Sequence, residues 1–159
     1  MMRSTYRIVV GVDGSEGGRR ALRWAVREAA RHGGTVQAVS AWQWKGLESV
    51  SMGAANATVE REQAEEVLAR EVEAAASGID PAPPIARETV EGPAPRVLTE
   101  AARDADLLVL GSHGHGRLRH AALGSVSEET VRQADCPVVI IPVPHPDRAL
   151  RSAVPVVRA

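Results

Sequence analysis

The sequence predicts an α/β fold, a single doubly wound sheet of five parallel strands with helices on both faces. Short, almost continuously apolar runs alternate with amphipathic segments of helical length along the 159 residues. Strands that are apolar at every position are typical of parallel sheets that are covered on both sides. The length is typical of one domain, so we expect residues 1–144 to form a single domain and residues 145–159 to be a C-terminal tail.

The first half of the chain contains two predicted strands and two predicted helices. The β-branched run 7–12 predicts a buried strand, which ends at the turn Asp13-Gly14-Ser15. Apolar residues at helical spacing between 22 and 29 predict a helix, and a glycine pair ends it. Residues 35–41 predict the second strand. Residues 42–57 are polar and aperiodic, and we interpret them as a loop before a long helix over 58–76.

The second half alternates in the same way. Residues 85–91 predict the third strand. Pro95 stands near the first position of the next helix, where the missing N–H of a proline costs little, and this helix ends near residue 104. A fourth strand is predicted over 106–110. A glycine-rich segment then leads to a helix over 125–134, and residues 138–143 predict the fifth strand.

The overall composition excludes several classes of function. With 19 basic and 20 acidic residues the net charge is −1, which does not favour binding to nucleic acid or to an anionic membrane. No apolar run approaches the roughly 20 residues of a membrane span. The single cysteine, Cys136, excludes an intramolecular disulfide and is typical of a reducing compartment. We therefore expect a cytoplasmic protein that binds neither nucleic acid nor a membrane.

The segment from Gly111 to Ser127 has the features of an anion site. Its glycines let backbone N–H groups turn toward a ligand, and the helix that follows has a positive dipole end. An alternative fits the same residues: Ser125 with Glu128 three residues later forms a capping box, which satisfies the helix end without a ligand. The spacing alone favours neither the anion site nor the capping box.

Two common nucleotide fingerprints are absent. A P-loop needs Gly-Lys followed by Ser or Thr, and the only lysine in the chain is Lys45. A dinucleotide-binding turn needs G-x-G-x-x-G after the first strand, where this chain has Gly11-Val12-Asp13-Gly14-Ser15. Any nucleotide site therefore follows another pattern.

That pattern resembles the ATP-binding universal stress proteins. Gly111-x2-Gly114-x9-Gly124-Ser125 matches their G-x2-G-x9-G-[S/T] motif without a gap. The resemblance covers about residues 5–143 and implies five parallel strands in the order 3-2-1-4-5. It also rests on further blocks in the family's order, at residues 8–15, 21–25, 90–93, 105–114 and 136–142.

The resemblance implies a site for ATP, which we expect to bind with Mg²⁺. Asp13 matches the acidic residue near the ribose and adenine; an Asx-turn or helix cap is the alternative, the resemblance favours binding, and the two roles are compatible. Ala41 falls where the family bonds adenine through its backbone. Four residues match the phosphate- and ribose-binding loop of the family: Gly111, Gly114, Gly124 and Ser125. Val126 and Ser127 occupy the next two places, where backbone N–H and hydroxyl groups meet the triphosphate.

The histidines His113, His115 and His120 do not predict a metal site. A structural zinc site takes four ligands, and Cys136 lies beyond the next helix, where we interpret it as an inert buried thiol.

Four further side chains near the motif have two interpretations each. Arg117 and Arg119 either reach outer phosphate oxygens or form a solvated loop face. Trp42 and Trp44 either stack on the adenine or anchor their loop by packing.

The residues favour binding over turnover. Phosphoryl transfer needs metal ligands and a charge clamp, and only Asp13 is a candidate near a metal. The sequence therefore predicts an ATP-binding regulatory protein, in which nucleotide occupancy modulates the dimer or an unidentified protein partner. The alternative is a slow ATPase with His113 or His115 as base. A ligand-free scaffold that acts by dimerisation does not account for the intact glycine motif.

The fifth strand predicts a homodimer. In the implied order it lies at the sheet edge, and residues 138–141 are apolar on both faces, which invites pairing with another chain. A two-fold pairing of the same strand is closed and forms a dimer. The alternative is that residues 154–157 of the tail cover this edge.

Overall fold

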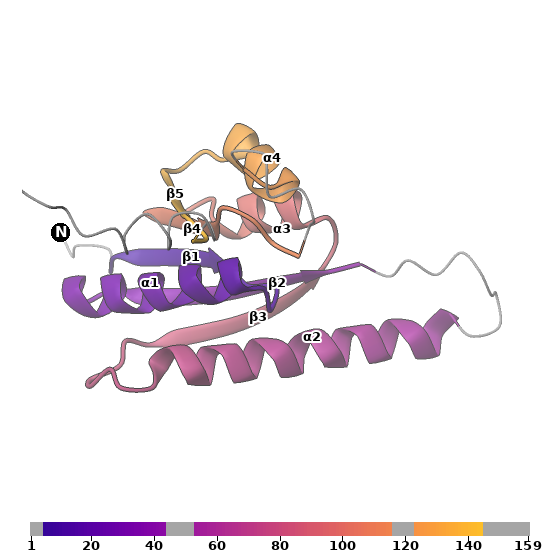
Figure 1. Cartoon of the computed structure of the whole chain (residues 1–159), viewed down its shortest axis with the longest axis horizontal. Helices are drawn as coiled ribbons and strands as arrows, with labels where there is room; N and C mark the ends of the chain where they lie inside the picture. The colour runs from indigo at the N-terminus through magenta and orange to yellow at the C-terminus, as the bar shows by residue number, and fades with distance from the viewer. Residues whose placement is uncertain (1–4, 44–52, 116–122, 145–159) are drawn as a thin grey trace, which may run out of the picture.

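Strands and helices alternate along the chain as the hydrophobic pattern predicts (Figure 1). The structure, a computed structural model, describes residues 5–43, 53–115 and 123–144. The elements are β1 (Arg7–Gly11), α1 (Glu16–His32), β2 (Thr35–Trp42), α2 (Gly53–Ala76), β3 (Ile85–Glu91), α3 (Ala94–Ala101), β4 (Leu107–Gly111), α4 (Ser125–Gln133) and β5 (Val138–Ile141).

The five strands form one parallel sheet in the order β3-β2-β1-β4-β5, which confirms the predicted fold. β1 lies at the centre, where Ile8 is in register with Val36 of β2 and Leu107 of β4. The chain leaves β1 toward one edge and later returns to build β4 and β5 toward the other. The strand order therefore switches between β1 and β4, which is where open α/β sheets bind ligands.

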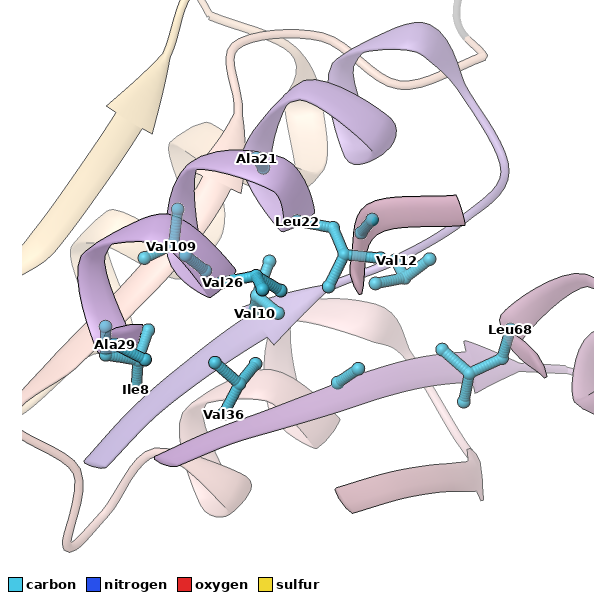
Figure 2. Close-up of a cluster of buried hydrophobic side chains, with 13 residues drawn as sticks. Ile8, Val10, Val12, Ala21, Leu22, Val26, Ala29, Val36, Leu68 and Val109 are labelled. Atoms are coloured by element: carbon cyan, nitrogen blue, oxygen red, sulfur yellow. The ribbon is translucent and has the colours of Figure 1, made fainter. Parts of the chain in front are cut away.

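Both faces of the sheet are covered, and this explains the uninterrupted apolar strands. Ile8 and Val10 of β1 pack under α1 with Leu22 and Val26 (Figure 2). Val9 points to the opposite face, where it joins the cluster that includes side chains of α3. Because successive side chains of a strand alternate between faces, Ile8, Val9 and Val10 of β1 each meet a hydrophobic layer.

The predicted loop over residues 42–57 is wrong at its end, because α2 begins at Gly53. These first residues include alanines, which favour a helix intrinsically, but they show no apolar periodicity. Figure 1 shows that this end of α2 projects past the sheet, so no core-facing stripe is required there. A hydrophobic pattern marks only those helical segments that have a buried face, so it gives no signal for the first residues of α2.

Smaller differences concern element ends and the termini. β1 and β5 end at Gly11 and Ile141, one and two residues before their predicted ends, and α3 ends at Ala101. The predicted tail, residues 145–159, lies outside the described residues. No helix in the described part of the chain is long and apolar enough to cross a membrane.

Candidate functional site

A cavity of about 470 Å³ opens at the carboxyl ends of β1 and β4. This volume is within the usual range of ligand pockets, and the place is the switch point of the sheet. The structure brings together every residue predicted for the nucleotide site, since the lining includes Asp13, Ala41, Gly111, Gly114, Gly124, Ser125, Val126 and Ser127.

One wall of the cavity is apolar, and sequence reasoning missed most of it. Val39 and Ala41 of β2, Ala94 and Leu98 of α3 and Leu110 of β4 all line the cavity and belong to one hydrophobic cluster. Four of these five residues carry no signal that separates a pocket wall from a core, because an aliphatic side chain in a strand or helix predicts burial alone. Such a wall suits a flat, weakly polar group such as a nucleobase.

The capping-box interpretation of the α4 helix start is wrong. The N-cap residue is Gly124, with φ −68° and ψ 159°, and no side chain caps the helix. Ser125 is therefore the first helical residue and lies one position too late to cap. The Glu128 carboxylate does not reach back, because it pairs with Arg132 one turn further along the helix.

The start of α4 retains unpaired backbone donors. The first intrahelical bond runs from the N–H of Glu128 to the Gly124 carbonyl at 2.9 Å. The three preceding N–H groups, of Ser125, Val126 and Ser127, have no acceptor within the described part of the chain, and all three residues line the cavity. A helix end of this kind attracts anions through its N–H groups and its dipole.

The hydroxyl of Ser127 has a structural role. Its Oγ donates to the Gly111 carbonyl at 2.7 Å, and the residue is buried. This bond ties the start of α4 to the end of β4. The resemblance implies a hydroxyl at the triphosphate, but in this structure the Ser127 hydroxyl is engaged within the protein.

Hydrogen bonds to Ser112 hold the two ends of the loop between β4 and α4. The Gly124 N–H donates to the Ser112 carbonyl at 2.7 Å, and the Ser112 N–H donates to Ile141 of β5 at 2.8 Å. The Ser112 hydroxyl accepts from the Val143 N–H at 3.0 Å and lies 3.1 Å from Nδ1 of His113. The loop ends are thus anchored to the fifth strand.

Close backbone approaches explain two of the motif glycines. A Cβ on Gly111 would lie 2.5 Å from the carbonyl carbon of Gly17, at the start of α1. A Cβ on Gly114 would lie 2.6 Å from Oδ2 of Asp13. Gly111 therefore lets α1 pack on the end of β4, while Gly114 lets the loop reach the Asp13 carboxylate.

Asp13 forms the predicted Asx-turn and also lies at the cavity. Its Oδ1 accepts from the Ser15 N–H at 2.9 Å and from the Ser15 hydroxyl at 2.5 Å. Ser15 in turn caps α1, because its Oγ accepts from the Gly18 N–H at 3.1 Å. The side chain of Asp13 remains exposed, so the turn role leaves it accessible to a ligand.

The imidazole of His115 links the two loops. Its Nε2 lies 2.7 Å from the Asp13 carbonyl oxygen. A carbonyl only accepts, so Nε2 carries the proton and donates it to this bond. Within residues 5–43, 53–115 and 123–144, no three His, Cys, Asp or Glu side chains gather as a metal site.

Of the other candidate residues, Trp42 is the last residue of β2 and is not among the described lining residues of the cavity. His120, Arg117, Arg119 and Trp44 are outside the described residues. Cys136 is half-buried in the cluster on the α3 face, and burial raises the pKa of its thiol, which agrees with the interpretation of an unreactive group.

Comparisons with known proteins agree on one family. The model of the universal stress protein family matches residues 5–142. A universal stress protein of Mycobacterium tuberculosis (strain ATCC 25618 / H37Rv) is 32% identical over 134 residues, which cover 84% of this chain and 47% of that protein. This chain therefore spans about half the length of that relative.

Two solved structures are similar in fold. The universal stress protein UspA from Lactobacillus plantarum is 22% identical with a TM-score of 0.73, covering 87% of this chain and 99% of that one. A universal stress protein in complex with cAMP is 27% identical with a TM-score of 0.58, covering 87% and 97%.

Proposed function

Because this chain belongs to the universal stress protein family, we propose that it is an ATP-binding regulatory protein. The observation that carries the proposal is the uncapped start of α4, which opens on a cavity whose lining also includes an apolar cluster. A ligand with a base at one end and phosphates at the other matches both parts. The similar structure that contains cAMP supports an adenine nucleotide as that ligand.

We assign the parts of the nucleotide from the apolar part of the lining and from the free N–H groups at the start of α4. We place the adenine against Val39, Leu98 and Leu110, beside the backbone of Ala41 at the end of β2. The phosphates then lie at the N–H groups of residues 125–127, where a helix dipole stabilises negative charge. We place the ribose beside Asp13, which is exposed and lines the same cavity.

The charges of the cavity favour binding of the nucleotide with Mg²⁺. The described lining residues include two carboxylates, Asp13 and Glu128, and neither Arg nor Lys. A triphosphate there requires a counter-ion, and the Asp13 carboxylate offers the hard oxygen ligand that Mg²⁺ prefers. The ion would neutralise phosphate charge and orient the chain of phosphates.

Binding explains the described residues better than hydrolysis does. In the alternative, a slow ATPase, His113 or His115 acts as the base. The Nε2 of His115 already donates to the Asp13 carbonyl, and the Nδ1 of His113 lies against the Ser112 hydroxyl. Both of these nitrogens are engaged with protein groups, so we propose that the chain is a regulator that responds to occupancy. We also propose that it acts in the cytoplasm.

The edge strands support a homodimer through β5. All four β5 residues, from Val138 to Ile141, are half-buried aliphatic side chains. The opposite edge, β3, carries exposed charges at Arg87 and Glu88, which protect an edge from pairing. We propose that two copies pair along β5, and that nucleotide occupancy modulates this contact or the contact with a protein partner.

Calorimetry with the full chain tests the proposed ligand. ATP with Mg²⁺ should bind more tightly than adenosine, which lacks the phosphates, and more tightly than GTP, whose base differs. Chromatography of nucleotide released from the denatured protein provides an independent readout. Equal affinity for ATP and adenosine would contradict the phosphate site, and turnover that disappears in His115→Ala would favour the ATPase.

A further inference from the structure

We propose that Arg19 and Glu71 are a positioning pair that holds the turn of Asp13 at the cavity. Neither residue is among the described lining residues, so the pair acts on the ligand through the turn. The inference rests on the proposed nucleotide site and assigns a function to a contact between α1 and α2.

Arg19 of α1 contacts the turn directly. Its Nη1 donates to the carbonyl of Gly14 at 3.2 Å. Gly14 has a φ of +77°, a conformation that glycine adopts easily, and it stands between Asp13 and Ser15, the residue whose N–H and hydroxyl hold the Asp13 carboxylate. The orientation of this peptide therefore affects where Asp13 points.

Glu71 of α2 is the buried partner of the arginine. Its side chain is only 6% exposed, and its Oε1 lies 3.7 Å from the same Nη1 of Arg19. Arg70, which is mostly exposed, places its Nε 3.9 Å from that oxygen. A buried carboxylate is costly unless cations compensate it, and such a pair contributes more to a defined geometry than to stability.

A second contact connects α2 to the same turn. Val67 lies one helical turn before Glu71, and a Cβ on Gly14 would be 3.0 Å from its Cγ1. α2 thus covers Gly14 with an aliphatic group and holds its carbonyl through Arg19. From the other side, His115 donates to the Asp13 carbonyl. The turn is therefore held between α2 and the loop that follows β4.

Calorimetric titration of ATP with Mg²⁺ into the full chain tests the pair. Arg19→Gln and Glu71→Gln should each weaken binding about tenfold, the lower range for residues that orient a ligand-binding group. Arg19→Lys keeps the charge beside Glu71 and should recover most of the affinity. Arg23→Gln on α1 and Glu73→Gln on α2, both exposed, are matched controls that should bind like the wild type.

A double-mutant cycle separates positioning from general stability. If Arg19 acts through the turn, Arg19→Gln should add less than about twofold once Asp13→Asn has removed the charge that it positions. Fully additive losses, or wild-type affinity in both glutamine variants, would overturn the inference while leaving the proposed function intact. No binding of ATP by the wild-type chain would instead overturn the proposed function, and the inference with it.

Discussion

Two helices begin at the same cavity, and their first turns differ. At α1, Ser15 caps the helix through the Gly18 N–H and is itself held by Asp13. At α4, Gly124 occupies the equivalent position and has no side chain to offer. Both helices have an acidic residue in the first turn, so their dipoles are similarly compensated. The difference is that a side-chain oxygen accepts from a first-turn N–H in α1 and none does so in α4.

This difference locates the proposed phosphate site. A capped helix end attracts an external anion less, because its own side chain accepts from one of the free donors, here the N–H of Gly18. An uncapped end beside a cavity leaves three N–H groups available. In the proposed site, one turn presents Asp13 and the other receives the phosphates.

The largest expected effect comes from giving α4 a cap. In Gly124→Asp the new Cβ would have only ordinary contacts, at 3.4 Å or more, and the backbone angles suit an N-cap, so the fold should survive. The carboxylate would occupy the N–H groups and repel phosphate, and affinity for ATP should fall at least about 100-fold, because juxtaposed like charges cost several kcal/mol.

Gly124→Asn is the matched control for that variant. The amide caps the helix with nearly the same shape but without charge, so its loss of affinity should be smaller than that of aspartate. Calorimetry measures both, and thermal melting checks the fold. Wild-type affinity in Gly124→Asp would exclude the start of α4 as the phosphate site.

A smaller effect is expected at the other turn. Asp13→Asn keeps an oxygen that accepts from Ser15 and removes only the charge. Affinity for ATP with Mg²⁺ should fall about tenfold, within the range for a hydrogen bond to a charged group. The melting temperature should change little. Unchanged affinity with a lower melting temperature would mean that Asp13 serves the turn alone.

The smallest effect on binding is expected from removing the α1 cap. Ser15→Ala should lower the free energy of unfolding by about 1 kcal/mol, as loss of a helix cap does. Affinity for ATP should stay within about twofold of wild type, because the Ser15 N–H still holds Asp13. Urea unfolding and calorimetry on the same sample give the two numbers. A large loss of affinity would remove the distinction between the two helix ends.

The fold, and the meeting of the predicted site residues at one cavity, followed from the sequence for a physical reason. Parallel strands buried on both faces are apolar throughout, so their order along the chain is easily recognised. The turns that follow β1 and β4 must meet at one edge of the sheet, and all the predicted site residues line one cavity there.

Other features carried no sufficient local signal. Ser125 and Glu128 have the spacing of a capping box. Because the N-cap is Gly124, the helix starts one residue too early for Ser125 to be the cap and for Glu128 to be its partner. The pairing of Arg19 with Glu71 joins two helices that are far apart in sequence, and only the packed structure reveals it.

Amide NMR spectra of the full chain, titrated with ATP and separately with adenosine, test the central claim most directly. Hydrogen bonds to phosphate should move the amide resonances of Ser125, Val126 and Ser127 with ATP and leave them nearly in place with adenosine. The amide of Gly18, which is already bonded to Ser15, should respond little to either. Large shifts at Gly18 with ATP, and none at the start of α4, would contradict the account.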